Sequence, residues 1–212
     1  PEFLLKIEGD IHTLSTPWVM GILNITPDSF YAKSRLDAPS EAASRSVQML
    51  KEGARIIDVG AYSSRPGAAP VTPEEEWNRL EAILPAVAEQ VAQYPGTFIS
   101  VDTFRAEVAQ KALAAGAHII NDISGGNLDP DIYHVAAEHQ SPYIMMHMQG
   151  DPSTMQNNPT YNHVTQDIVQ FFSEKLPQLH DLGVHDTIVD VGFGFGKTLD
   201  HNYQLLRELK AF

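Results

Sequence analysis

Six apolar runs in this sequence each end in polar residues that could bind a ligand. These residues are amides, carboxylates and one imidazole, and they are Asn24, Asp58, Asp102, Asn121 with Asp122, His147 and Asp190. Each run has the composition of a strand that is buried on both faces, as in a parallel sheet. The carboxyl ends of such strands meet at one rim, which is where an α/β barrel keeps its active site. The sequence therefore predicts that these side chains lie close together.

Two carboxylates and one amide in this set have the chemistry to bind a heterocycle. Asp102 and Asp190 could accept hydrogen bonds from an N–H-rich ring, and Asn121 offers both a donor and an acceptor beside them. The two carboxylates could instead be structural partners of loop amides, and the sequence leaves both interpretations open. It assigns no role to Asp58 or Asp122.

Asn24 is a candidate metal ligand. Mg²⁺ is typically held by one or two protein oxygens together with water and substrate phosphates, and Asn24 supplies a neutral oxygen at the end of its run. A strand-end asparagine is more often a turn former, however. His147 stands between Met146 and Met148, where a histidine is more often a packed core residue than a base or a ligand.

Three loops have unusual length or composition. The loops over about 26–39 and 60–72 are longer than the two to six residues of most strand–helix loops, which is typical of lids and binding elements. Arg65, in the second loop, could clamp a phosphate or carboxylate, or it could be solvated. The glycine-rich run 192–197 fits neither nucleotide-binding spacing. We interpret it as backbone that approaches a ligand closely, with Phe193 or Phe195 as a wall; a plain turn is the alternative.

These residues need a regular series of strands and helices to position them. The apolar patterns predict a short hairpin up to Thr16, and then strands over 18–25, 56–59, 97–101, 117–121, 142–147 and 187–191. Helices are predicted over 40–53, 73–94, 105–115, 129–139, 161–182 and 200–211. Six strand–helix units without a break in composition predict one α/β domain over residues 1–212. A doubly wound sheet gathers its ligand-binding groups at one switch point, whereas here every strand ends in a polar residue. This pattern favours a (β/α)8 TIM barrel, of which six units are present.

Composition excludes several classes of protein. The 212 residues contain no cysteine, which excludes disulfides, thiolate metal sites and cysteine nucleophiles, and suits a cytoplasmic protein. The net charge of -13 argues against nucleic acid or an anionic membrane as a partner. No apolar run approaches the roughly 18 residues of a membrane span. The first residues show no basic stretch followed by an apolar one, so we expect no secretory signal.

The motifs, taken in order, resemble those of dihydropteroate synthase, the folate-pathway family. The matching segments are Asn-Ile-Thr-Pro-Asp-Ser-Phe at 24–30, Asp-Val-Gly-Ala-Tyr-Ser-Ser-Arg-Pro-Gly at 58–67, and the strand ends at 100–103, 120–125, 146–150 and 190–197. The resemblance implies a transferase that condenses 6-hydroxymethyl-7,8-dihydropterin pyrophosphate with 4-aminobenzoate and releases pyrophosphate. It also implies Mg²⁺ as cofactor, a pterin-stabilised cation, competition by sulfonamides, and a homodimer in the full-length protein.

The same resemblance implies roles for individual residues. Asn24 would be the metal ligand, and the pterin would be held by Asp102, Asn121 and Asp190. The pyrophosphate and its lid would involve Ser64 and Arg65, and the aminobenzoate pocket would be bordered by Phe30, Arg65, Pro66 and Phe195. Asp37 would be the acidic residue of the first lid. No residue is assigned as a catalytic acid or base.

The sequence departs from the family pattern in two places. The first lid reads Phe-Tyr-Ala-Lys-Ser-Arg at 30–35, where many members have Ser-Asp-Gly-Gly. The family's last two strands, with a lysine and an Arg-x-His motif, do not occur, and the cations left for an anion are Arg65 and Lys197. We therefore expect that the 212 residues alone are inactive and that the protein continues for roughly 50–70 residues, by comparison with a typical barrel length.

Two other functions remain as alternatives. One is a methyltetrahydrofolate-binding methyltransferase domain, which shares the pterin carboxylates but needs neither Mg²⁺ nor an aminobenzoate lid. The loops with Thr-Pro-Asp-Ser-Phe and Ser-Arg-Pro-Gly argue against it. The other is a non-catalytic pterin-binding fragment.

Overall fold

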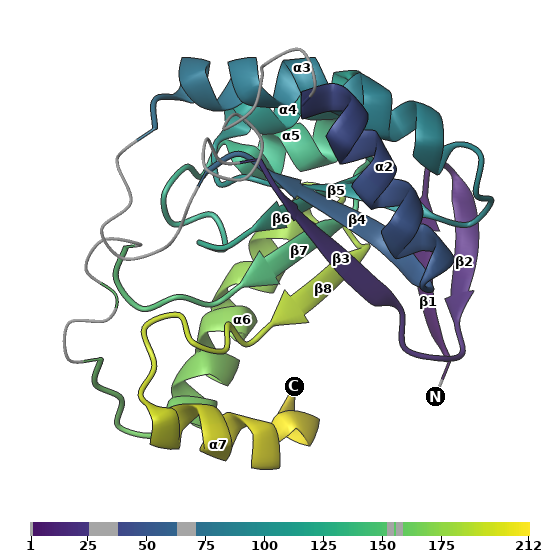
Figure 1. Ribbon diagram of the computed structural model, residues 1–212. Coiled ribbons are helices and arrows are strands. Elements are labelled where there is room, and N and C mark those ends of the chain that lie inside the picture. The colour runs from purple at the N-terminus through teal and green to yellow at the C-terminus, as the bar shows by residue number, and fades with distance from the viewer. Residues whose placement is uncertain (1, 26–37, 63–70, 152–154, 156–158) are drawn as a thin grey trace.

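Six parallel strands form one sheet in the order in which they occur in the chain. The computed structural model describes residues 2–25, 38–62, 71–151, 155 and 159–212. The strands are β3 (Val19–Asn24), β4 (Ala54–Gly60), β5 (Phe98–Asp102), β6 (Ile119–Asp122), β7 (Tyr143–Met146) and β8 (Thr187–Asp190), each hydrogen-bonded to the next (Figure 1). An antiparallel hairpin of β1 (Phe3–Ile7) and β2 (Asp10–Leu14) precedes them. The predicted hairpin and all six predicted strands are confirmed.

A helix follows every strand of this sheet, as predicted. The helices are α2 (Ala38–Lys51), α3 (Pro73–Val91), α4 (Ala106–Ala114), α5 (Ile132–Glu138), α6 (Val164–Asp181) and α7 (Leu199–Arg207), with a final 3-10 turn, η1 (Leu209–Ala211). The start of α3 shows why the local sequence folds this way. The Thr72 hydroxyl accepts a hydrogen bond from the Glu75 backbone N–H, and the Glu75 carboxylate accepts one from that of Thr72. This reciprocal pair satisfies two N–H groups that the helix itself leaves unpaired.

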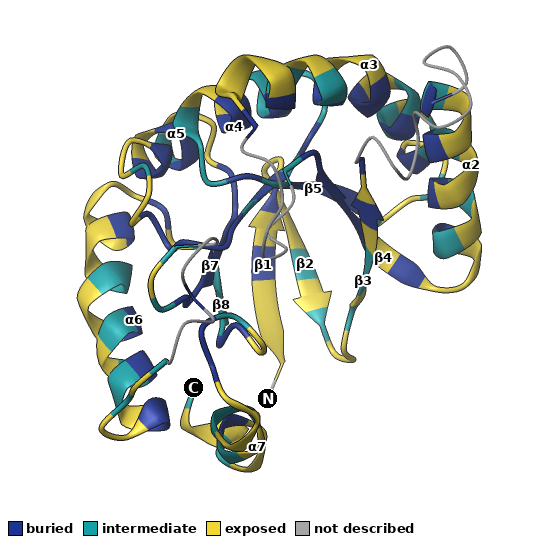
Figure 2. Cartoon of the chain, turned by 60° about the vertical axis from the view of Figure 1, so that its left-hand side comes forward, coloured by how far each residue is buried: buried dark blue, intermediate teal, exposed yellow. Residues whose placement is uncertain are grey.

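Helices α2 to α6 lie on the outer side of the curved sheet. Figure 2 shows α2 to α6 as an arc outside the strands, with the β1–β2 hairpin inside the curve. A doubly wound sheet would carry helices on both faces and would reverse its strand order, so this arrangement is that of a barrel. Within the described residues, β3 and β8 are the edge strands, and each pairs on one side only.

Both faces of the strands are covered by apolar side chains, which explains the continuous apolar runs. On the outer face, Ile57 and Ile99 pack in one cluster with Leu80 and Ile83 of α3. On the inner face, the hairpin's Leu5 and Ile7 pack with side chains of the strands, namely Ile56, Phe98, Ile119 and Ile144. Burying one such aliphatic side chain stabilises a fold by about 1.5–3 kcal/mol. The hairpin thus closes the amino end of the sheet and leaves the carboxyl end for the site.

Candidate functional site

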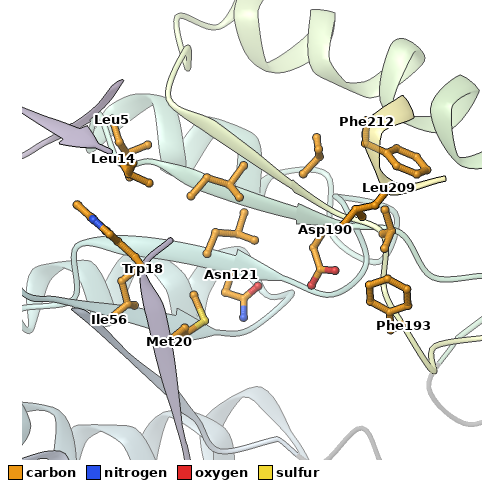
Figure 3. Close-up of a pocket in the computed structure, with 14 residues that line it drawn as sticks. Leu5, Leu14, Trp18, Met20, Ile56, Asn121, Asp190, Phe193, Leu209 and Phe212 are labelled. Atoms are coloured by element: carbon orange, nitrogen blue, oxygen red, sulfur yellow. The ribbon is translucent and has the colours of Figure 1, made fainter. Parts of the chain in front are cut away.

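A cavity of about 400 Å³ lies within the curve of the sheet. Its walls are mostly apolar and extend from the hairpin to the carboxyl ends of the strands: Leu5, Leu14, Trp18, Met20, Ile56, Ile144, Ile188, Val189, Val191, Phe193, Leu209 and Phe212 (Figure 3). Asn121 and Asp190 add polar groups to this lining. Apolar walls with a few convergent polar groups are typical of a small-molecule site. Two of the three residues predicted to hold a pterin therefore line one cavity.

Asn121 has a fixed orientation at the end of β6. Its side-chain Nδ2 lies 3.2 and 3.1 Å from the two carboxylate oxygens of Asp58 and donates to them. A carboxylate can only accept, so the amide nitrogen must face Asp58. The Asn121 oxygen lies on the side of Asp190 in Figure 3. Asn121 therefore presents an acceptor to the cavity.

Asp58 lies beside Asn121 and is buried, with 4% of its surface exposed. The Ser100 hydroxyl donates to its Oδ1 at 2.5 Å. Burial raises the pKa of Asp58 to about 6, and the hydrogen bonds from Ser100 and Asn121 offset part of that rise. No role for Asp58 could be predicted from the sequence. The signal that could have revealed one is Ser100, a polar residue in a buried strand that pairs with Asp58 in the sheet.

Asp102 is the last residue of β5, and its side chain lies next to Gly60 of β4. A Cβ added at Gly60 would lie 3.1 Å from both the Cβ and Oδ2 of Asp102, so glycine makes room for this carboxylate. Burial, followed by the charges of Asp58, Glu76 and Asp122, holds the pKa of Asp102 well above its usual range. The carboxylates of Asp58, Glu76 and Asp122 create a negative potential around Asp102, which favours a ligand rich in N–H groups.

Asp190 ends β8 and serves both the turn and the cavity. Its Oδ1 accepts a hydrogen bond from the Gly192 backbone N–H at 2.8 Å, and the residue also lines the cavity. The two interpretations that the sequence left open for Asp190 are thus compatible, since one oxygen orders the turn and the carboxylate still borders the cavity.

Asp122, next to Asn121, anchors a loop. Its carboxylate accepts hydrogen bonds from the Ser124 backbone N–H and hydroxyl, from the Gly126 N–H and from the Tyr143 hydroxyl. Asp122 is fully buried and is not among the cavity-lining residues. Its role in the described structure is to order the segment that follows β6.

Lys197 is not available to a bound anion, which corrects the possibility that the sequence left open. Its Nζ donates to the backbone oxygens of Phe195 (2.9 Å) and His147 (3.2 Å) and lies 3.2 Å from Nδ1 of His147. Burial lowers the pKa of Lys197 to about 7. Burial and the Lys197 charge lower the pKa of His147 to about 3. His147 is thus neutral and packed, as its methionine neighbours predicted.

The glycines before Lys197 allow two backbone segments to approach each other. Gly192 has φ +67°, and a Cβ there would lie 2.1 Å from the His147 backbone oxygen. The close approach in this structure is therefore to the segment after β7, whereas the sequence predicted an approach to a ligand. Phe193 borders the cavity. Phe195, predicted to border an aminobenzoate pocket, packs against a cluster of apolar side chains: Ile123, Met146, Met148 and Met155.

Asn24 ends β3 with an exposed side chain. The neighbouring Ile25 N–H donates to the Gly60 oxygen at 2.7 Å and holds this end of β3 against β4. The described part of the chain contains no group of three or more histidine, aspartate or glutamate residues that could hold a metal ion. Other predicted site residues lie outside the described residues: Phe30, Asp37, Ser64, Arg65 and Pro66.

The chain is similar to known proteins over most of its length. A family model described as pterin binding enzyme matches residues 20–212. The dihydropteroate synthase of Escherichia coli K12 is 44% identical over 210 residues, which cover 98% of this chain and 73% of that protein. The chain belongs to the dihydropteroate synthase family of pterin-binding enzymes. A folate synthesis bifunctional protein of Arabidopsis thaliana is 43% identical over 196 residues, which cover 91% of this chain and 40% of that protein.

Solved structures of dihydropteroate synthases are also similar to this chain. The Yersinia pestis enzyme with a sulfonamide drug superposes with a TM-score of 0.84 at 40% identity, covering 98% of this chain and 74% of that one. The Xanthomonas albilineans enzyme with 4-aminobenzoic acid gives a TM-score of 0.83 at 36% identity, covering 99% and 73%. The predicted (β/α)8 barrel fold, with six strand–helix units in this chain, is confirmed by this likeness. In the described parts of this family member, no helix is long and apolar enough to cross a membrane.

Proposed function

We propose that the protein catalyses the dihydropteroate synthase reaction. The amine of 4-aminobenzoate replaces the pyrophosphate of 6-hydroxymethyl-7,8-dihydropterin pyrophosphate, so that a C–N bond forms and a C–O bond breaks. The observation that carries the proposal is the apolar cavity into which Asn121 and Asp190 bring polar groups. Structures of the Xanthomonas albilineans relative contain 4-aminobenzoic acid and 7,8-dihydropteroate, which are a substrate and the product of this reaction.

The strand-end residues would bind and polarise the pterin. Asp102 and Asp190 would accept hydrogen bonds from the N–H-rich edge of the ring, and Asn121 would accept one between them. A hydrogen bond to a charged group contributes about 1.5–3 kcal/mol, so these contacts would provide much of the affinity. The carboxylates would also stabilise the positive charge that develops on the pterin as the pyrophosphate departs.

We also propose that the protein binds a magnesium ion at the rim of the sheet. Asn24 offers one neutral oxygen at the rim, and one or two protein oxygens with water and phosphate are the usual surroundings of Mg²⁺. When bound, Mg²⁺ would neutralise charge on the leaving pyrophosphate. A homodimeric state, a cytoplasmic location and competition by sulfonamides are further proposals from the family.

Replacing Asn24 with alanine should weaken Mg²⁺-dependent binding of the pterin pyrophosphate by at least about tenfold, the usual cost of disturbing a metal's surroundings. Binding of the bare pterin should not change, because Asn24 would touch only the metal. Calorimetric titrations of both ligands, with and without Mg²⁺, measure this difference. Asn121→Ala is the matched control and should weaken both ligands. Equal losses for the two ligands in Asn24→Ala would show that Asn24 is structural.

Release of pyrophosphate in the presence of both substrates tests the proposed function directly. In the full-length protein, release that depends on 4-aminobenzoate supports the proposal, whereas pterin binding without release supports a non-catalytic pterin-binding protein. The expected inactivity of the 212 residues alone stays a prediction. The unpaired edges of β3 and β8 would expose backbone groups, and Lys197 is already bonded within the fold. Turnover comparable to that of a full-length dihydropteroate synthase would contradict this prediction.

A further inference from the structure

Asp58 joins three neighbouring strands through its carboxylate. It stands on β4, accepts a hydrogen bond from Ser100 of β5, and accepts two from the amide of Asn121 on β6. It is buried and does not belong to the cavity lining, whereas Asn121 does. The hydrogen bonds from Asn121 therefore connect Asp58 to the cavity.

An asparagine amide has a donor end and an acceptor end of nearly the same shape. Its orientation is set by the groups around it, because rotation by half a turn exchanges the two ends. Facing Asp58, the Asn121 oxygen would meet a carboxylate oxygen, and two acceptors repel each other. The orientation with the nitrogen toward Asp58 is therefore strongly favoured, and it leaves the oxygen for a ligand.

Holding this carboxylate in the interior lowers the stability of the fold. The pKa of Asp58 is raised to about 6 by burial, above its ordinary value in an unfolded chain. A raised pKa means that stability is lost as the pH rises through about 6, since the charged form is disfavoured in the folded protein. Asparagine at this position would avoid that loss, so stability alone does not account for an aspartate here.

We propose that Asp58 is a positioning residue that fixes the amide of Asn121, so that the Asn121 oxygen accepts a hydrogen bond from a ring N–H of the pterin. This inference rests on the proposed function, because it requires a pterin in the cavity. It adds a residue that does not touch the ligand, and it states which end of Asn121 does.

A double-mutant cycle tests this indirect action, since a residue that acts through Asn121 loses its effect once Asn121 is removed. Binding of 6-hydroxymethylpterin is measured by calorimetry at pH 8 in the wild type, Asp58→Asn, Asn121→Ala and the double variant. Asp58→Asn should weaken binding about fivefold to tenfold, the loss expected for one hydrogen bond. In the Asn121→Ala background, the same substitution should have almost no effect.

Two further variants separate positioning from general disturbance of the site. Ser100→Ala removes the other donor to Asp58 and keeps the bond to Asn121, so its affinity should stay within about twofold of the wild type. Asp58→Ala is measured in the same cycle and repeats the test if Asp58→Asn does not fold. Thermal unfolding without ligand checks that each variant is folded.

Three results would overturn the inference: wild-type affinity in Asp58→Asn, an equal loss in both backgrounds, or an equal loss in Ser100→Ala. Failure of the wild type to bind 6-hydroxymethylpterin is a different result. That result would contradict the proposed function, and the inference would then lose its basis.

Discussion

Replacing Asp190 with asparagine should weaken pterin binding by about tenfold to a hundredfold. The substitution removes the charge that would accept a ring N–H, and a charge-assisted hydrogen bond contributes about 1.5–3 kcal/mol. The asparagine Oδ1 can still accept the hydrogen bond that Gly192 donates to Asp190, so the turn after β8 should keep its shape. Calorimetric titration of 6-hydroxymethylpterin into wild type and variant measures the loss.

Asp122→Asn is the matched control for this prediction. It makes the same chemical change in a carboxylate that also ends a strand, but Asp122 is bonded to Ser124, Gly126 and Tyr143. We expect Asp122→Asn to lower the stability of the fold. Its pterin affinity should stay within about threefold of the wild type, a change smaller than the loss of one hydrogen bond to the ligand. Unchanged affinity in Asp190→Asn, or an equal loss in both variants, would contradict the role of Asp190.

The sequence predicted the strands, the helices and the polar rim because each depends on local patterns. An apolar run that stops at Asn121 or Asp190 identifies both a strand and the edge at which it ends. In a sheet whose strands follow chain order, such ends are neighbours in space. The cavity between Asn121 and Asp190 follows from this rule.

Residues whose roles depend on distant partners could not be predicted in this way. Asp58 is 42 residues from Ser100 and 63 from Asn121, so its role depends on how three strands align. Lys197 could be seen as a candidate for binding an anion, because its charge is visible in the sequence. The carbonyl groups of His147 and Phe195 that engage it have no sequence signal at all.

Arg105 is another residue whose partners are distant in the chain. Its guanidinium pairs with Glu76 of α3, donates to the Val71 oxygen at 2.7 Å, and lies over the rings of Phe104 (4.8 Å) and Tyr62 (5.4 Å). The Glu76 side chain is fully buried. Arg105 thus compensates a buried charge and connects the start of α4 to both ends of the second long loop.

Replacing Arg105 with methionine should lower the free energy of unfolding by about 3–5 kcal/mol, because it leaves the Glu76 carboxylate buried without its partner. For a chain of this size, each kcal/mol lowers the melting temperature by about 2–4 °C, so thermal unfolding should shift by roughly 6–20 °C. Glu76→Gln should lower the free energy of unfolding by less than Arg105→Met does, since it removes the buried charge itself. The double variant should therefore be more stable than Arg105→Met alone.

The dependence of this loss on pH distinguishes an unpaired charge from lost packing. The pKa of Glu76 is raised by burial, and the hydrogen bond with Thr103, the contact with Arg105 and the charge of Arg79 oppose that rise. Without Arg105 the folded-state pKa should rise further, and a raised pKa costs stability as the pH rises through it. The deficit of Arg105→Met should therefore be smaller at about pH 5 than at about pH 8 when unfolding is measured with denaturant. A deficit of the same size at both pH values would mean that Arg105→Met is less stable because it loses the contacts with Tyr62 and Phe104. The unpaired charge of Glu76 would then not be the cause.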